Sequence, residues 1–455
     1  MKAKLKRMIG TKEFYKAVMV IALPIMAQQF VTSFVNLIDN VMIGSVGSIA
    51  LTSVTVANKF YLIYNSTLFG LCGASCIFIA QYYGADDHEK CQEVFDINLF
   101  LSLLAGLIFT LLVLFIPTQI LQLFSKTPII VETGLSYLKY IKYSYLPFAL
   151  SMTVMTALRA VGINHLQLKI GIVTVFTNTF LNYILIFGHF GMPSLGVQGA
   201  AMATLIARLV ELFIYLIVLF RKKHYFIFNL KGMGHLNFSL MKKMMIKAIP
   251  LTLNEIMFSL GNAMIFKAYI RTDEFLVAAI SVVDTVLNIA FIVFSGLSSA
   301  VSILIGNKLG ANQLEEAREN SLKLIVFGAF IGAVAGFLLI VSSPFIPHIY
   351  HLESQINTTI TTMLCIKGCL IPIYVINVCI FFVLRAGGDA TSTLIMDSGF
   401  LWGANVLVST VLSLMFSLPL IHLYFIVESL DLIKMFVATY FYRKGKWVRN
   451  MTVEG

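Results

Sequence analysis

The chain is predicted to be an all-α integral membrane protein with twelve transmembrane helices in two related bundles of six. Its 455 residues are 58% hydrophobic and 12% charged, and its mean hydropathy is +0.88, whereas a soluble globular chain carries about 25% charged residues. Apolar segments of about 20 residues, each long enough to cross roughly 30 Å of hydrocarbon as a helix, recur along the sequence. The second half of the chain also repeats the first.

Short polar breaks separate the apolar segments and set the boundaries of the predicted helices. The first bundle is expected to contain helices at residues 14–43, 48–82, 93–116, 129–158, 165–188 and 196–220. The second is expected to contain helices at residues 243–270, 275–306, 319–342, 356–385, 391–418 and 420–442. Several segments are longer than one crossing requires, so these helices are expected to tilt or to protrude from the bilayer.

Lysine and arginine indicate the orientation in the membrane. They gather at the N-terminus, around Arg159 and Lys169, in the loop from Arg221 to Lys247, after Gly306 and in the tail YRKGKWVRN, whereas turns such as IGSVGS and FGHFGMPSLG carry almost none. By the positive-inside rule both termini are expected to be cytoplasmic, in a multi-pass protein of the cell membrane. The net charge of +11 therefore reflects topology and attraction to lipid headgroups. Its division among short loops argues against a nucleic-acid partner.

An offset of 226 residues aligns the two halves of the chain. ALPIMAQQ at 22 matches AIPLTLNE at 248, GADDHEKCQE at 84 matches GANQLEEARE at 310, and LRAVG at 158 matches LRAGG at 384. Because six is an even number, both copies enter the membrane from the same side, as in transporters built from parallel repeats. We therefore expect an N-lobe at residues 1–220, a basic cytoplasmic linker at 221–242 and a C-lobe at 243–455.

The order, duplication and spacing of these motifs, together with the segment NTFLNYILIFG, resemble the multidrug and toxic compound extrusion (MATE) family of the MOP superfamily over residues 12–443. The similarity is to bacterial NorM-like and DinF-like members. The resemblance implies a V-shaped central cavity and alternating access. It also implies a monomeric secondary transporter, surrounded by membrane lipid, that exports organic drugs or metabolites, cationic or amphipathic, in antiport with Na⁺ or H⁺. No cofactor other than the coupling ion is expected.

A polar cluster is expected in the N-lobe around Asp39, in the stretch FVNLIDNVMIG. Asn178 and Asn182 are four residues apart and share one helix face, and Thr204 lies at a similar estimated depth. Carboxylate, amide and hydroxyl oxygens suit a small hard cation. The resemblance assigns these four positions to a cation or proton site, although some archaeal relatives have aspartate in place of Asn182. Alternatively, Asp39 pairs with Lys59 and the amides only join helices.

A second coupling or substrate site is expected in the C-lobe. Glu255 lies at mid-depth of the seventh span, where burial favours the neutral form of a carboxyl group and permits proton exchange near neutral pH. The resemblance matches it to a family glutamate. Asn377 stands where sodium-coupled NorM relatives have aspartate, which disfavours a complete sodium site. Asp284 and Asp397 either take over that role or pair with lysines.

Lysines within the predicted spans make the interior unusually basic. Lys142 and Lys367 lie about 12 residues from a helix start, too deep to reach the headgroups easily. Lys59, Lys139 and Lys267 also lie in the predicted spans. Either they neutralise the buried carboxylates in ion pairs, or the cavity accepts anionic molecules. Pairing is the preferred interpretation.

Other side chains in the spans are assigned to substrate contact or to local pairing. Aromatic faces suit promiscuous binding and cation–π attraction, and four are candidates for substrate contact: Tyr61, Tyr140, Phe258 and Tyr374. Two charged pairs, Arg208 with Glu211 and Asp431 with Lys434, are spaced three residues apart and are expected to form ion pairs.

Other classes of function are less consistent with the sequence. No phosphate-binding loop of the ATPase type is present, and no catalytic or metal-binding set is predicted. Asp86 and Asp87 would suit a metal–diphosphate enzyme, but the repeat has Asn312 and Gln313 in their place. The main alternative is a flippase or exporter of a lipid-linked or anionic metabolite that uses the basic cavity. A polytopic enzyme or a channel is disfavoured.

Overall fold

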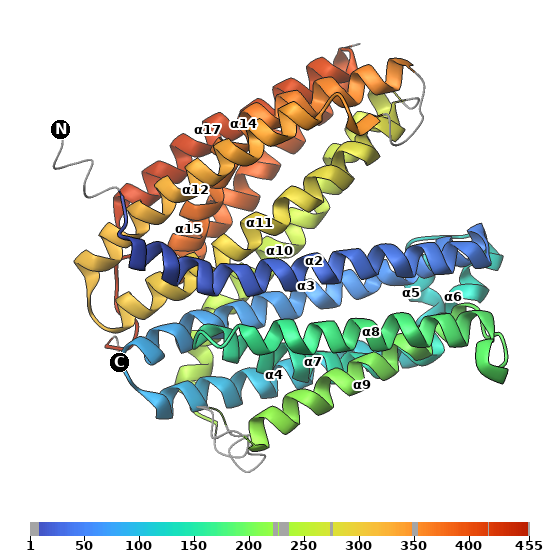
Figure 1. Ribbon diagram of the computed structural model, residues 1–455, viewed down its shortest axis with the longest axis horizontal. Coiled ribbons are helices and arrows are strands. Elements are labelled where there is room, and N and C mark those ends of the chain that lie inside the picture. Colours follow the sequence, from blue (N-terminus) through green and yellow to red (C-terminus); the bar gives the residue numbers. More distant parts are fainter. Residues whose placement is uncertain are drawn as a thin grey trace. The chain divides into compact units, whose positions relative to one another are not determined.

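The all-helical fold predicted from the sequence is confirmed. The structure is a computed structural model that describes residues 9–221, 226, 236–273, 276–347, 354–416 and 418–453, and these residues form helices and turns without a strand (Figure 1). They divide into two compact units. We call Ala27–Thr252 the N-terminal unit, and Met1–Met26 together with Leu253–Gly455 the C-terminal unit. The predicted linker at 221–242 lies largely outside the described residues.

The N-terminal unit is a bundle of long helices. It contains α3 (Ser48–Gly84), α4 (His88–Phe115), α5 (Pro117–Gln122), α6 (Pro128–Ile141), α7 (Tyr145–Ala160), α8 (His165–Phe187) and α9 (Val197–Arg221), together with parts of α2 (Lys12–Val46) and α10 (Phe238–Thr272). α3 packs against α4, α6 and α7, and α9 packs against α8 and α6. Buried Tyr64, Leu68, Cys72 and Tyr145 belong to the core between these helices.

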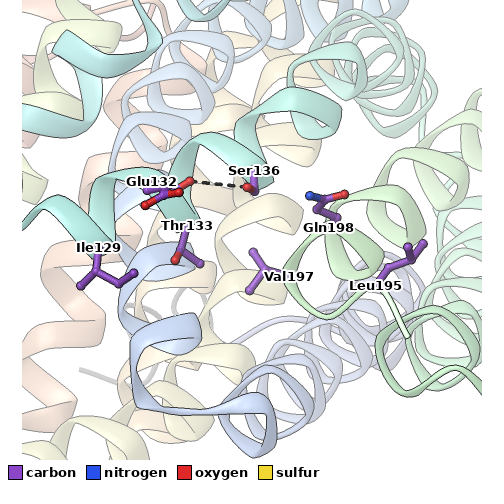
Figure 2. A pocket seen from close by; sticks show the side chains of 7 residues that line it. All are labelled: Ile129, Glu132, Thr133, Ser136, Leu195, Val197 and Gln198. Atoms are coloured by element: carbon purple, nitrogen blue, oxygen red, sulfur yellow. Dashed lines mark hydrogen bonds between the residues drawn. The ribbon is translucent and has the colours of Figure 1, made fainter. Parts of the chain in front are cut away.

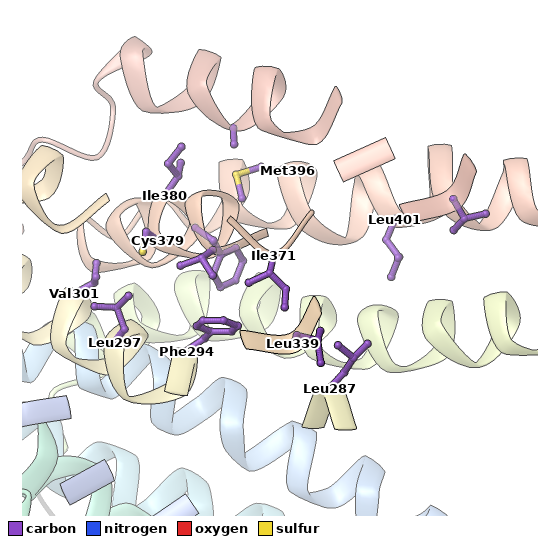
Figure 3. Close-up of a cluster of buried hydrophobic side chains, with 14 of the residues drawn as sticks. Leu287, Phe294, Leu297, Val301, Leu339, Ile371, Cys379, Ile380, Met396 and Leu401 are labelled. Atoms are coloured by element: carbon purple, nitrogen blue, oxygen red, sulfur yellow. The ribbon is translucent and has the colours of Figure 1, made fainter. Parts of the chain in front are cut away.

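The C-terminal unit is built around one central helix. It contains α11 (Val277–Gly310), α12 (Leu314–Ser342), α14 (Ser354–Ala386), α15 (Ala390–Leu394), α16 (Leu407–Met415) and α17 (Leu420–Lys444), with two π-helical segments, η4 (Ile395–Gly399) and η5 (Leu401–Val406). α14 packs against α11, α12 and α17. Figure 3 shows part of the apolar core, in which Phe294, Leu297 and Ile371 are buried.

Helices correspond to all twelve predicted spans. Among the described residues, ten helices are long and apolar enough to cross a membrane. The predicted span at 129–158 is divided into α6 and α7 by a 3₁₀ turn, Lys142–Ser144. Pro147 accounts for this break, because a proline ring clashes with the carbonyl four residues earlier and lacks an N–H donor. The span at 420–442 corresponds to α17, whose apolar stretch is interrupted by Glu428, Asp431 and Lys434.

The acidic turn between α3 and α4 is structural. Asp87 caps α4 by accepting a hydrogen bond from the Lys90 backbone N–H at 3.0 Å. Asp86 has a left-handed backbone with φ of 61° and lies 3.2 Å from His88 Nε2. Its repeat counterpart Asn312 has φ of 58°, and aspartate and asparagine tolerate this conformation better than most residues.

Candidate functional site

The four polar residues predicted for the N-lobe lie together in the N-terminal unit. Asp39 on α2 accepts a hydrogen bond from Asn182 Nδ2 on α8 at 2.7 Å. With its amide nitrogen turned toward Asp39, Asn178 donates to both carboxylate oxygens at 3.0 and 2.9 Å. The other end of the Asn178 amide lies 3.4 Å from Thr204 Oγ1 on α9. Residues from three helices therefore surround one carboxylate.

This cluster can hold one small positive ion beside Asp39. Asn178 and Asn182 are 7% and 1% exposed, and Asn182 Oδ1 has no hydrogen-bond partner among the described residues. Rotation of the two amides would exchange their N–H donors for oxygens, so the same side chains can serve a bare carboxylate or a cation. An unpaired buried amide oxygen is costly, and a bound cation or protonated carboxyl would satisfy it.

Basic residues near this cluster are engaged elsewhere. Lys59 is exposed on α3, and the hydrogen-bond partners of Asp39 are amides. Arg208 lies one turn beyond Thr204 on α9, and its guanidinium pairs with Glu211 at 2.8 Å. The predicted Arg208–Glu211 pair is therefore confirmed.

The carboxylates predicted in the C-lobe are held by basic side chains. Glu255 on α10 accepts a hydrogen bond from Arg385 Nη1 on α14 at 3.2 Å. Asp397 in η4 accepts hydrogen bonds from Lys434 Nζ on α17 at 2.6 Å and from Asn254 Nδ2 at 3.1 Å. The predicted Asp431–Lys434 pair is wrong, because the Lys434 ammonium reaches across to Asp397. Helix-to-helix geometry prevails over the three-residue spacing on α17.

The remaining predicted C-lobe residues lie outside this arrangement. Asn377 is buried on α14 and donates to the Asp431 backbone carbonyl at 3.1 Å. Asp284 is exposed on α11. Neither hydrogen-bonds to Glu255 or Asp397 within the described part of the chain. Asn254, which hydrogen-bonds to Asp397, directly precedes Glu255. The structure therefore brings Glu255 and Asp397 near one another and leaves Asn377 and Asp284 apart.

The predicted lysines and aromatic residues have varied surroundings. Lys367 is buried and donates to Glu428 on α17, whereas Lys142 is half-buried beside the Tyr143 ring at 5.2 Å. The four candidate aromatics are all partly buried and come from different helices: Tyr61 on α3, Tyr140 on α6, Phe258 on α10 and Tyr374 on α14.

Sequence reasoning overlooked Glu428 and Arg385 as partners of the named residues. Glu428 lies in an otherwise apolar span, and its charge was a signal that could have identified it. Arg385 belongs to the LRAGG motif, which served only as evidence for the internal duplication. The pairings themselves join residues 61 and 130 positions apart, so they cannot be obtained from spacing along one helix.

A shallow pocket in the N-terminal unit involves none of the predicted site residues. It has a volume of about 310 Å³ between the start of α6 and the start of α9. Figure 2 shows Glu132, Thr133 and Ser136 on one side and Gln198 on the other. With a single exposed carboxylate, this pocket does not resemble the cluster of half-buried Asp39 and its two buried asparagines.

Known proteins identify the family of this chain. The MatE family model matches residues 24–184 and 250–411, which together exceed half of the sequence. The chain belongs to the MATE family. The two matched segments fall in the two halves of the internal duplication, as expected for a MATE protein with two related bundles.

Individual relatives agree with this assignment. A probable multidrug resistance protein NorM of Thermotoga maritima is 23% identical over 453 residues, covering 96% of this chain and 94% of the relative. A probable NorM of Halalkalibacterium halodurans is 27% identical over 346 residues, covering 75% of each chain. The solved structure of a MOP superfamily transporter from Pyrococcus furiosus has the same fold, with a TM-score of 0.86, 18% identity and 97% coverage of both chains.

Membership of the MATE family establishes the broad class of the protein. MATE proteins are multidrug efflux transporters and not enzymes, so this chain is a membrane transporter that handles small molecules. The apolar helices provide the membrane-spanning part that such a transporter requires.

Proposed function

We propose that this protein is a secondary active exporter that moves small organic molecules, cationic or amphipathic, out of the cell in antiport with Na⁺ or H⁺. The observation that carries the proposal is the cluster around half-buried Asp39, whose carboxylate is hydrogen-bonded by two buried neutral amides. Relatives named as multidrug resistance proteins support the substrate class. We further propose a monomer in the cell membrane with both termini in the cytoplasm.

The chemistry of the cluster explains how one ion can be coupled to transport. A carboxylate in a protein interior is stabilised by a neutralising proton or cation. Asn178 and Asn182 donate to Asp39 when it carries its charge, and their oxygens can face a cation when one binds. The energy of binding can then shift the population between two conformations, provided that the ion binds one of them more tightly. Entry of the ion down its gradient would then drive the substrate in the opposite direction, out of the cell.

Purified protein in liposomes tests the proposal. A fluorescent organic cation should move against its gradient when a Na⁺ or H⁺ gradient is imposed separately, and Asp39→Asn should reduce gradient-driven transport at least about tenfold, because the ionisable group is lost. Asp86→Asn is the matched control: its side chain is 91% exposed, and the repeat has Asn312 in that position. Undiminished coupling in Asp39→Asn would refute the assigned coupling site.

Export of anions is less well supported. Lys367 and Lys434 each pair with a carboxylate, so their charges are compensated within the C-terminal unit. We therefore expect counterflow of a fluorescent cation to exceed that of an anion of similar size. Faster exchange of the anion would favour the lipid-linked or anionic metabolite alternative.

A further inference from the structure

A buried ion pair in the C-terminal unit already accommodates a primary ammonium group. Lys367 on α14 donates to Glu428 on α17, and the two side chains are 8% and 18% exposed. The Lys367 ammonium also lies 5.5 Å from the centre of the Tyr374 ring, within the range of a cation–π contact. An –NH₃⁺ group has three donors, so one carboxylate and one aromatic face leave donors free.

Two tyrosine hydroxyls near this pair lack partners. Tyr269 on α10 and Tyr424 on α17 are 5% and 3% exposed, and neither hydroxyl has a hydrogen-bond partner among the described residues. Their rings are 5.8 Å apart. Tyr424 lies four residues before Glu428 on α17, so the two side chains share one face of that helix. Since buried polar groups are generally hydrogen-bonded, these hydroxyls indicate a ligand with several donors.

We propose that Glu428 and the hydroxyls of Tyr269 and Tyr424 form a binding site for a primary ammonium group of the substrate, and that the Lys367 ammonium occupies this site when no substrate is bound. The site offers one carboxylate and two hydroxyl oxygens as acceptors, and one basic side chain competes for the carboxylate. A quaternary ammonium group has no N–H donor and would leave the hydroxyls unsatisfied. The role in export rests on the proposed efflux function, but binding itself does not depend on transport.

Competition by Lys367 leads to opposite effects of the two single substitutions. Lys367→Met keeps a long unbranched side chain, removes the competing charge and should strengthen binding of butylammonium about tenfold or more. Glu428→Gln removes the principal acceptor and should weaken it by a similar factor. If the ion pair were purely structural, Lys367→Met would leave Glu428 unpaired and destabilise the fold without strengthening the binding of butylammonium.

Titration calorimetry on the purified full-length protein tests this inference, with butylammonium as the probe and butyltrimethylammonium as its quaternary control. Tyr269→Phe combined with Tyr424→Phe keeps the ion pair and should lower butylammonium affinity severalfold without changing the melting temperature. The inference fails if Lys367→Met does not bind butylammonium more tightly than the parent protein, if the quaternary control binds equally well, or if the double phenylalanine variant binds normally. Gradient-driven transport, measured separately, distinguishes failure of this site from failure of the efflux proposal.

Discussion

Two carboxylates that look alike in the sequence have different surroundings at the scale of the residue. Glu255 faces Arg385 at 3.2 Å, so its negative charge is compensated by a fixed part of the chain. Asp39 is held by the amides of Asn178 and Asn182, which carry dipoles and no net charge. A mobile ion can therefore neutralise Asp39 more readily than Glu255, and we propose ion coupling for Asp39 and lobe stabilisation for Glu255.

The Arg385–Glu255 pair provides a test of this division of roles. Arg385→Gln leaves Glu255 without its partner and should destabilise the protein by about 3 kcal/mol, the order expected for breaking a buried pair. Adding Glu255→Gln should recover most of the loss, because the unpaired charge is removed. Thermal unfolding in detergent measures both effects. A double variant as unstable as Arg385→Gln would show that Glu255 does not depend on Arg385 in this way.

At the scale of the element, the segment after α17 packs on the turn between α14 and α15. Trp447 is 1% exposed, and Arg449 donates to the Gly387 and Gly388 carbonyls at 3.1 and 2.8 Å. A Cβ atom on Gly387 would lie 2.0 Å from the Trp447 carbonyl oxygen. The first glycine of LRAGG, Gly387, thus lacks a side chain because the backbone of the tail passes against it.

Gly387→Ala is therefore expected to destabilise the C-terminal unit by about 2 kcal/mol, since the backbone of the tail must shift to remove the clash. Gly403→Ala is a suitable control, because a Cβ there meets nothing within 4 Å and alanine favours helical structure. Melting temperatures in detergent compare the two. Equal stability of both variants would contradict the close packing of the tail.

At the scale of the whole molecule, the duplication organises the chain beyond its sequence motifs. The N-terminal unit ends at Thr252 and begins at Ala27, so α2 and α10 each contribute to both units. The chain passes from one unit to the other after Met26 and after Thr252, and these two positions are 226 residues apart, like the repeats. Each position lies two residues after a proline inside the helix, Pro24 in α2 and Pro250 in α10. The repeat therefore predicts where each long helix passes from one unit to the other.

Single-cysteine labelling in cells tests the proposed orientation. Phe190, between α8 and α9, and Val453, beyond α17, are 79% and 74% exposed. In a background without the native cysteines, a membrane-impermeant maleimide should label Phe190→Cys in intact cells and Val453→Cys only after permeabilisation, because the positive-inside rule places the basic tail in the cytoplasm. The reverse pattern would invert the topology.

The sequence by itself determined the helical class, the helix boundaries to within a few residues and the twofold repetition, whereas the companions of Asp39 came from the family resemblance. Backbone groups in a bilayer must be hydrogen-bonded within the spanning segment, so apolar length and i, i+4 spacing are local signals of structure. Only the tertiary structure decided that Arg385 faces Glu255, that Lys434 faces Asp397 rather than Asp431, and that Lys367 faces Glu428. These contacts depend on the rotation and depth of separate helices, which packing sets and no single segment encodes.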